Sequence, residues 1–256
     1  MKAVARTLIG LLLITGNNAF CQKTKVKAKV KQAQERFKVE DYSYPYYAII
    51  NNGPSPISGC FINYKNISYF VTTRHNFYTT TNERRKISNV MIFIDPNNMK
   101  NSAKVLSLNM TDQKILPVCF DFGCTDIILL PVNIPKELPV NYVSLDAKES
   151  FENKEMSIVG YIKDSLSIIE TKFDSYLPRD STYFLTEKSS PKDQSGSPVL
   201  IYYKYKTRGI AKVVLAGIYS GKEISQEYFD KGLISRASFI TRFLNSKTKE
   251  QLLGKE

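Results

Sequence analysis

Residues 58–77 read "SGCFINYKNISYFVTTRHNF", two runs of aromatic and β-branched residues separated by a short polar break. Tyr, Phe, Val, Ile and Thr are enriched in strands, and a short break between two such runs is typical of a hairpin. We therefore predict two strands that turn at Lys65 and Asn66. His75, the only histidine in the chain, follows the second run directly and should lie at the end of that strand or in the loop after it.

The chain beyond residue 44 shows the same pattern of short strand-forming runs. Short apolar or alternating runs, such as "NVMIFID", "MSIVGYIKD" and "AKVVLAGIYSG", are divided by turn residues at short spacing. Strand after strand at this spacing is typical of a β-sandwich or a β-barrel. The Pro-rich stretch at 131–141 divides the strands into two similar halves, so we expect an all-β body made of two parts.

A different spacing occurs near the C-terminus. In "SRASFITRFLNS", residues 235–246, Phe239, Ile240, Phe243 and Leu244 recur at the interval of one helical turn. Apolar residues at this interval lie on one face of a helix. We therefore expect a terminal helix that packs on the second half.

The N-terminus has the layout of a secretory signal peptide. It consists of a positively charged start, "MKAVART", an apolar run, "LIGLLLITG", and a polar exit with small residues, "NNAFCQ". The apolar run is too short to span a bilayer as a stable helix. A buried core helix is the alternative, but the position at the extreme N-terminus favours export, to the periplasm or out of the cell. A lipid anchor on Cys21 is a less favoured alternative, because the preceding residues fit a lipoprotein signal poorly.

The formal net charge of +12 is concentrated at the N-terminus. The first 40 residues contain nine Lys/Arg and two Asp/Glu, whereas the remainder contains 27 against 22. The Lys-rich stretch at 23–38 is expected to form a solvated arm, and contact of this arm with an anionic membrane surface or cell wall stays open. A nucleic-acid partner is not expected, because the body is only mildly basic and export removes the usual targets.

The single histidine restricts the chemistry that the chain can support. A histidine-rich metal site needs a second imidazole, and the four cysteines include no CxxC pair, so we expect no metal and no cofactor. A lone histidine is most often structural. A general base that works near neutral pH is nevertheless most economically His75.

Asp126 is a candidate partner for this histidine. It precedes the apolar run "IILLPV", where a partly desolvated carboxylate is costly unless it has a hydrogen-bonding partner. An ionised carboxylate only accepts hydrogen bonds, so the N–H of a histidine suits it. The alternative is a turn residue that caps the start of the strand.

The stretch "SSPKDQSGSPVL", residues 189–200, combines Ser, Gly and Pro. These residues are the usual components of turns, and taken alone the stretch is a polar connection between two strands. Because a base and a carboxylate are present elsewhere in the chain, one of its hydroxyls is also a candidate nucleophile.

Together these stretches resemble the trypsin-like serine proteases of the chymotrypsin fold, and most closely their bacterial secreted branches. The matching segments are "SGCFINYKNISYFVTTRHNF", "TDIILLPV" and "DQSGSPVLI", in the order His, Asp, Ser. The resemblance implies an all-β chymotrypsin-like fold of two six-stranded antiparallel β-barrels packed together, with a C-terminal α-helix. It further implies that Ser195 is the nucleophile, His75 its base and Asp126 the residue that orients the imidazole.

The resemblance also assigns the neighbours of the nucleophile. The backbone N–H groups of Asp193 and Ser195 would form the oxyanion hole, and Ser197 is assigned to packing. Asp193 stands where the family usually has glycine, so a second hypothesis stays open, a catalytically inactive relative that acts as a binding or regulatory module. Gln194 replaces the aspartate that pairs with a newly cleaved N-terminus in digestive proteases, so activation of that kind is not expected.

The expected substrates are proteins or peptides. By the resemblance, Ser189 lies near the floor of the primary pocket, and Tyr219, Ser220 and Gly221 pair with the substrate backbone as an added strand. No acidic residue is evident in the sequence near Ser189, so a preference for Arg or Lys is not supported.

Cys119 and Cys124 flank a predicted hairpin turn, and they either form a disulfide in an oxidising compartment or remain buried thiols like Cys60.

The chain is therefore divided into five segments. The segments are a signal peptide at 1–21, a basic arm at 22–44, an N-terminal β-barrel at 45–135, a C-terminal β-barrel at 136–235, and a C-terminal helix and tail at 236–256.

Overall fold

The computed structural model describes most of the chain beyond residue 44. The described residues are 45–51, 53, 56–94, 104–145, 151–152, 154–162, 165–190, 194–205, 209–223 and 225–253. The expected signal peptide, the basic arm, Cys21 and Asp193 lie outside these ranges. In the part of the chain that is described, no helix is long and apolar enough to cross a membrane.

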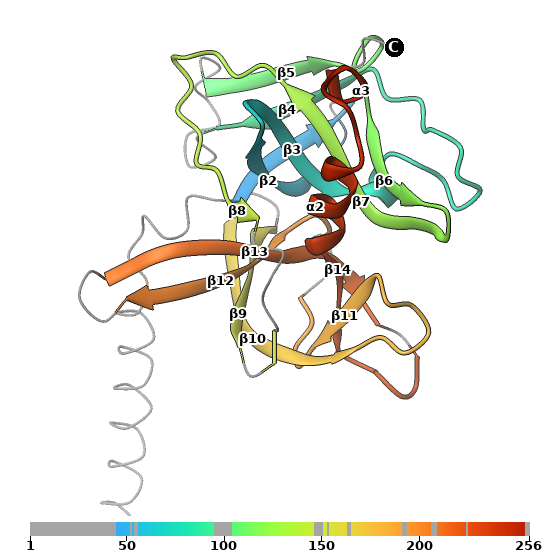
Figure 1. The fold of residues 1–256 in the computed structure, drawn as a ribbon, viewed down its shortest axis with the longest axis vertical. Helices are drawn as coiled ribbons and strands as arrows, with labels where there is room; N and C mark the ends of the chain where they lie inside the picture. Colours follow the sequence, from blue (N-terminus) through green and yellow to red (C-terminus); the bar gives the residue numbers. More distant parts are fainter. Residues whose placement is uncertain are drawn as a thin grey trace, which may run out of the picture. The chain divides into compact units, whose positions relative to one another are not determined.

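The first half of the described chain forms an antiparallel sheet of seven strands, in the order β5-β4-β1-β2-β3-β7-β6 (Figure 1). Between β2 and β3, Lys65 and Asn66 have φ angles of 51° and 64°, the left-handed conformation that a two-residue hairpin turn requires. The predicted hairpin is therefore confirmed. The strands are β1 (Pro45–Ile50), β2 (Pro56–Tyr64), β3 (Ile67–Thr73), β4 (Asn89–Phe93), β5 (Val105–Asn109), β6 (Leu116–Phe120) and β7 (Gly123–Val132).

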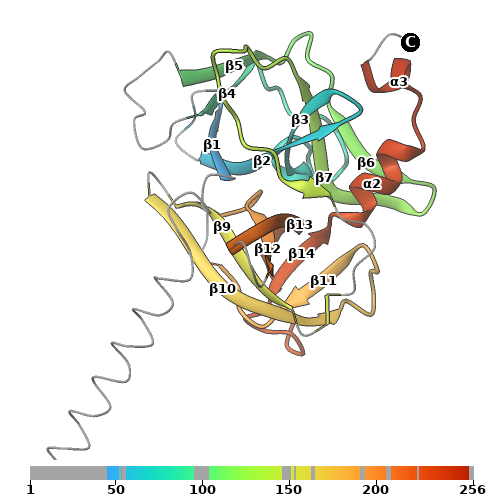
Figure 2. The same cartoon turned by 60° about the vertical axis from the view of Figure 1, so that its left-hand side comes forward.

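The second half forms a closed ring of six antiparallel strands, β12-β9-β10-β11-β14-β13, in which β12 also pairs with β13 (Figure 2). The short strand β8 adds to β13 in parallel. Neither β8 nor β14 stands out in the sequence, because β8 has two residues and β14 runs almost directly into the helical pattern. The strands are β8 (Ser144–Leu145), β9 (Glu155–Ile162), β10 (Ser165–Tyr176), β11 (Tyr183–Thr186), β12 (Pro198–Tyr205), β13 (Gly209–Lys222) and β14 (Gly232–Arg236).

The all-β class and the two strand-built halves are confirmed, but the strand count differs from the expectation of two six-stranded barrels. The first sheet has seven strands, and within the described residues no ladder joins its outer strands β5 and β6. The second half is the closed six-stranded barrel that was expected, with β8 added to it.

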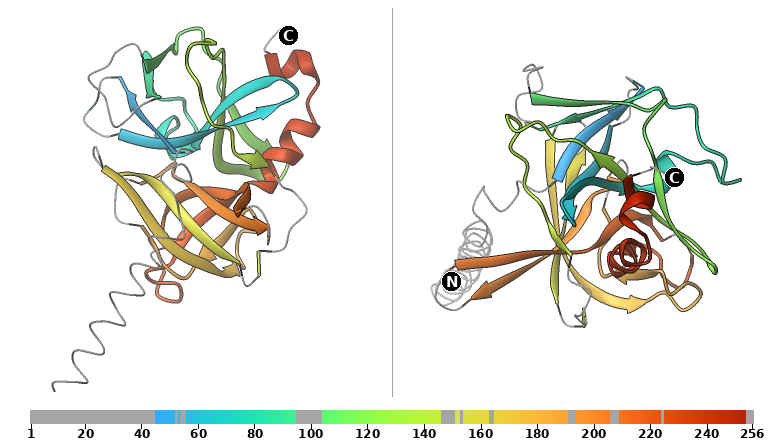
Figure 3. Two further views of the ribbon diagram at one scale, coloured as in Figure 1. Left: turned by 90° about the vertical axis from the view of Figure 1, so that its left-hand side faces the viewer. Right: turned by 45° about the horizontal axis from the view of Figure 1, so that its top comes forward.

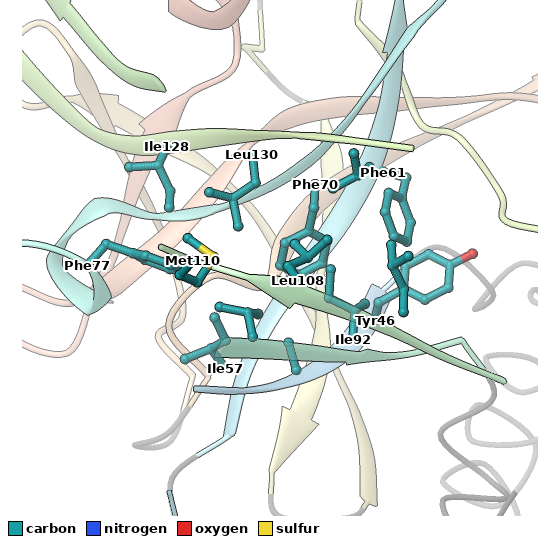
Figure 4. Close-up of a cluster of buried hydrophobic side chains, with 14 residues drawn as sticks. Tyr46, Ile57, Phe61, Phe70, Phe77, Ile92, Leu108, Met110, Ile128 and Leu130 are labelled. Carbon is teal, nitrogen blue, oxygen red and sulfur yellow. The ribbon is translucent and has the colours of Figure 1, made fainter. Parts of the chain in front are cut away.

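The strands of the first sheet contribute buried side chains to one apolar core (Figure 4). Its aromatic centre is formed by Tyr46, Phe61 and Phe70, with ring centroids 4.7 Å apart for the first pair and 5.4 Å for the second. Fully burying an aromatic or branched apolar side chain contributes roughly 1.5–3 kcal/mol, so this core is ample to hold the strands in place. The buried aliphatic and sulfur-containing residues around it include Ile57, Ile92, Leu108, Met110, Ile128 and Leu130.

The helix α2 (Ser238–Asn245) forms where the helical spacing predicted it, but it packs against a different element (Figure 3). Phe239 lies edge-on to Phe120 and Phe122 of the β6–β7 hairpin, with ring centroids 5.6 and 6.1 Å apart. The expectation that this helix packs on the second half is therefore wrong for its main aromatic contacts. The spacing identifies the apolar face of a helix, but it does not show which sheet covers that face.

The same β6–β7 hairpin carries a disulfide. Cys119 and Cys124 are paired across the two strands and joined by an S–S bond. Of the two alternatives for these cysteines, the structure thus has the disulfide. Cys60 is a free, fully buried thiol, and burial raises its pKa far above that of an exposed thiol. A second short helix, α3 (Lys249–Leu253), follows α2.

Candidate active site

The register of β3 and β7 brings His75 beside Asp126. Thr73, the last residue of β3, pairs with Ile127 of β7. The chain then turns into a short 3-10 helix, Arg74–Asn76, directly after the strand, so His75 lies where the sequence predicted it. Because the strands are antiparallel, the residue that precedes Ile127 faces the start of this 3-10 helix. The pairing of His75 with Asp126 thus follows from the strand register.

Both oxygens of the Asp126 carboxylate accept a hydrogen bond from His75. The backbone N–H of His75 donates to Oδ1 at 2.8 Å, and the ring Nδ1 lies 2.7 Å from Oδ2. The Asp126 side chain is 14% exposed and the imidazole is 45% exposed. An ionised carboxylate can only accept, so Nδ1 carries the hydrogen and Nε2 carries the lone pair.

Neighbouring side chains hold this pair in place. The Asn76 side chain donates to Thr73 Oγ1 at 2.6 Å, which ties the 3-10 helix back to the end of β3. From the second half, Tyr183 of β11 lies near the carboxylate. The pKa of Tyr183 is raised to about 12, first by burial and then by the negative charge of Asp126. A residue of each half, His75 and Tyr183, therefore lies close to Asp126.

The candidate nucleophile Ser195 lies in the turn before β12, against the first sheet. Its carbonyl oxygen accepts a hydrogen bond from the backbone N–H of Ser58, at 3.4 Å. The following residue, Gly196, has a φ of +94°, and a Cβ atom there would lie 2.1 Å from the Ser58 oxygen and 2.4 Å from Thr72 Oγ1. Thr72 precedes His75 by three residues, so the turn packs directly on the strand end that leads to the histidine.

The structure thus brings the three predicted residues into one region and directly pairs two of them. Within the described residues, no hydrogen bond joins Ser195 Oγ to His75, and the Ser195 backbone N–H donates none. Catalytic hydrogen bonds are often long or poorly aligned before substrate binds. Asp193, the other expected oxyanion donor, lies outside the described residues.

Ser197, two residues after the candidate nucleophile, faces the contact between the halves. Its side chain is fully buried, and a Cβ atom on Gly160 of β9 would lie 1.8 Å from its oxygen. The Ser58 hydroxyl accepts the backbone N–H of Tyr161 at 3.0 Å in the same contact. Glycine at position 160 therefore lets the two halves approach closely at this point, and Ser197 has the packing position that was expected.

Tyr219 of β13 lies behind the nucleophile turn. Its backbone N–H donates to the Ser197 oxygen and its carbonyl accepts the N–H of Gly196, both at 2.9 Å. Its phenol bonds to the backbone of Ser190, and the Ser190 hydroxyl donates to Gln194 Oε1. The expected pairing of Tyr219 with a substrate strand stays a prediction, but both of its backbone groups already bond within the protein.

Ser189 contacts a residue that the sequence did not reveal. Its hydroxyl donates to Asp230 Oδ1 at 3.2 Å, and the same oxygen lies 2.7 Å from Lys222 Nζ. An acidic group is therefore present beside Ser189, although it is already paired with a lysine. It was missed because it is 41 residues away in the chain and no pattern connects it to Ser189.

The other two predicted substrate-binding residues lie at the end of β13. The Ser220 hydroxyl is 2.9 Å from that of Ser235, and Gly221 has a φ of +149° with open space where a Cβ atom would be. The register of β13 against β14 shifts between Tyr219 and Gly221, as in a β-bulge. Their contact with a substrate stays a prediction. In the described part of the chain, no cluster of three metal-ligating side chains is found.

The fold is shared with solved structures of proteases. A thermostable serine protease, AL20, from an extremophilic microorganism is similar over 80% of this chain and 97% of its own, with a TM-score of 0.57 at 11% identity. The chain has the chymotrypsin fold. The inactive form of the Rv3671c protease from M. tuberculosis H37Rv is also similar, with a TM-score of 0.50 at 12% identity, over 80% of this chain and 89% of its own.

A viral protease shows the same likeness. The catalytically active tobacco etch virus protease, complexed with product, has a TM-score of 0.50 at 15% identity, over 80% of this chain and 78% of its own. No family model matches the chain, and neither does any curated protein. The likeness therefore concerns the chymotrypsin fold, and the function has to be argued from the site.

Proposed function

We propose that this protein is an exported serine endopeptidase that hydrolyses peptide bonds through Ser195, His75 and Asp126. The observation that carries the proposal is the double hydrogen bond from His75 to Asp126, beside the turn that holds Ser195. A carboxylate with both oxygens on one histidine fixes the ring and its tautomer. That arrangement suits a general base, whereas a surface histidine with a structural role does not need it.

In the first half of the reaction, Ser195 Oγ attacks the carbonyl carbon of the scissile peptide bond. His75 Nε2 takes the hydroxyl proton, and Asp126 stabilises the imidazolium that results. The tetrahedral intermediate then collapses, the C–N bond breaks, and His75 gives its proton to the leaving amine. The products of this half are a free amine and an acyl ester on Ser195. Water attacks the ester with the same base, and the acid is released together with the free Ser195 hydroxyl.

The oxyanion of the intermediate needs hydrogen-bond donors. The Ser195 N–H is free to serve because, in the described part of the chain, it donates to no other group. We assign the second donor to the backbone N–H of Asp193. One donor in such a site is worth about 3 kcal/mol of transition-state stabilisation.

Peptide or protein substrates and export are part of this proposal. The similar tobacco etch virus protease is complexed with product. A disulfide between Cys119 and Cys124 is expected in an oxidising compartment, which supports an exported protein. The signal-like N-terminus points the same way, and a lipid anchor at Cys21 or membrane contact of the basic arm would be compatible with it.

Covalent labelling with a fluorophosphonate probe tests the proposal. The wild type should be labelled on Ser195, and Ser195→Ala and His75→Ala should each lose labelling while remaining folded by circular dichroism. Ser197→Ala is the matched control, because its buried hydroxyl is in the same turn and makes no hydrogen bond within the described residues. A folded wild type that is not labelled would contradict the proposal and support the inactive binding module instead.

A further inference from the structure

The segment from Ser190 to Ser197 is attached at both ends to one residue. At its C-terminal end, Gly196 and Ser197 bond to the backbone of Tyr219, at 2.9 Å each. At its N-terminal end, the Tyr219 phenol accepts the N–H of Ser190 at 3.1 Å and donates to the carbonyl of Ser190 at 3.0 Å. The phenol oxygen thus makes the two hydrogen bonds that a neighbouring strand would otherwise provide.

These contacts are shielded from water. Tyr219 is 2% exposed, Ser190 is buried and Gln194 is fully buried. Without the phenol, neither backbone group of Ser190 would have a partner among the described residues, and an unpaired backbone group in a buried place is unfavourable. The pKa of Tyr219 is raised to about 12, mainly by burial, so its hydroxyl keeps its proton and can donate over the whole neutral range.

A third contact links the two ends from inside the segment. The Ser190 hydroxyl donates to Gln194 Oε1, one residue before Ser195. Gln194 is neutral, so no cationic partner is needed to keep it buried. The described ends of the segment are therefore held by Tyr219, by the Ser190–Gln194 contact and by the backbone hydrogen bond from Ser58 to Ser195, and none of these contacts is an ion pair.

We propose that the Tyr219 phenol is a positioning residue that holds the Ser190–Ser197 segment so that the Ser195 N–H points at the developing oxyanion. This inference rests on the proposed function, because the segment is the one that carries Ser195. The phenol does not touch the substrate. It acts through Ser190, and its removal should weaken transition-state stabilisation more than substrate binding.

Tyr219→Phe is the direct test, with Tyr203→Phe as the matched control. The control removes a buried tyrosine hydroxyl from the neighbouring strand β12 that has no hydrogen-bond partner within the described residues. We expect Tyr219→Phe to lower the rate of fluorophosphonate labelling and kcat by roughly 10- to 100-fold, with little change in KM, because small displacements of a reacting group have effects of this size. The control should match the wild type.

Binding of two ligands separates positioning from general damage. A peptide aldehyde, which forms an oxyanion on Ser195, should bind Tyr219→Phe more weakly, whereas the product peptide should bind as it does to the wild type. Ser190→Ala keeps both phenol bonds and loses only the contact with Gln194, so its effect should be smaller. Equal losses for both ligands, or a larger effect of Ser190→Ala, would overturn the role of the phenol.

Hydrogen exchange distinguishes failure of this inference from failure of the proposed function. The backbone amides of Ser190 and of residues 194–197 should exchange faster in Tyr219→Phe than in the wild type, whether or not the protein is an enzyme. A wild type that is not labelled would contradict the proposed function, and hydrogen exchange alone would then test the positioning role of the Tyr219 phenol. If labelling and exchange are both unchanged in folded Tyr219→Phe, only the positioning role is refuted.

A second change guards against a variant that does not fold. Replacing Tyr219 by a fluorinated tyrosine keeps the ring and the hydroxyl, so the folded state should survive, but the phenol becomes more acidic. Its ionisation removes the donor to the Ser190 carbonyl. The alkaline limb of the kcat profile should therefore move to lower pH, and an unmoved limb would contradict the proposal.

Discussion

The two sides of the candidate site are held by different means. On the first sheet, His75 and Asp126 meet because β3 and β7 are paired, and Thr73 lies opposite Ile127. On the second barrel, the Ser195 turn is held by single side-chain and backbone contacts, chiefly those of Tyr219. Strand register fixes the first side over many hydrogen bonds, whereas a few groups fix the second. Changes on the two sides should therefore have different consequences.

Asp126→Asn should have the largest effect on activity. The amide would present N–H groups where His75 now donates, so the ring would lose a partner or adopt the other tautomer, and kcat should fall by about 10⁴-fold. Strand pairing should keep the fold intact. The measurement is kcat on a peptide substrate, with Asp121→Asn, in the exposed turn of the same hairpin, as the control. Activity near that of the wild type would mean that the carboxylate does not orient the base.

Gly196→Ala should disrupt the second side through packing. An alanine at φ +94° costs roughly 1–2 kcal/mol, and its Cβ atom would lie 2.1 Å from the Ser58 oxygen, adding roughly 1–3 kcal/mol of overpacking. Gly123→Ala is the matched control, because φ is +132° there and nothing lies within 4 Å of the added atom. Urea unfolding should show the larger loss for Gly196→Ala. Equal losses would show that the close contact is not tight.

The difference between the two sides also explains what could be predicted from sequence. The hairpin at Lys65 and Asn66 and the position of His75 follow from alternation and turn residues, which act over a few positions. The order of His75, Asp126 and Ser195 along the chain supported the resemblance to a known family, and the fold was predicted from that resemblance. No strand or turn pattern in the sequence, however, predicts the hydrogen bonds between the Tyr219 phenol and Ser190, because this contact joins residues 29 positions apart through a side chain.

Two other differences have the same physical origin. The spacing around Phe239 gives the apolar face of α2 correctly, but its partners, Phe120 and Phe122, are set by how distant elements pack. Asp230 reaches Ser189 from a loop that has no regular pattern. Local periodicity therefore predicts elements and their faces, and side-chain partners across the fold need the structure.

The disulfide offers a test of intermediate size on the first side. Cys119 and Cys124 close a loop of a few residues, for which loop-entropy arguments give roughly 2 kcal/mol of stabilisation. The double variant Cys119→Ala/Cys124→Ala should lose about that much free energy of unfolding and keep most of its kcat, since β7 remains paired with β3. A large loss of kcat in this double variant would show that the hairpin, and not the β3–β7 register, holds Asp126.

Cys60 should resist alkylation in the native protein, because its buried thiol has a raised pKa.

The smallest effect concerns acid stability on the second side, at Glu223. Burial tends to raise the pKa of this carboxyl, whose side chain is 4% exposed, but hydrogen bonds from the Ser225 backbone and from Arg179 outweigh it and lower the pKa. A lowered folded-state pKa means that the carboxylate stabilises the fold above the usual glutamate value, and that this contribution is lost as the pH falls through the folded value.

Glu223→Gln should therefore be less stable than the wild type near pH 7, by about 1.5 kcal/mol, the lower end of the range for hydrogen bonds to charged groups, because the partner Arg179 is largely exposed. Unfolding curves at several pH values should show the gap closing as the pH falls below the usual glutamate pKa and through the lower folded-state value, where the wild-type carboxylate becomes protonated. A gap that is constant with pH would mean that the charge is not what holds the loop after β13. The loop would then depend, like the Ser195 turn, on individual neutral hydrogen bonds.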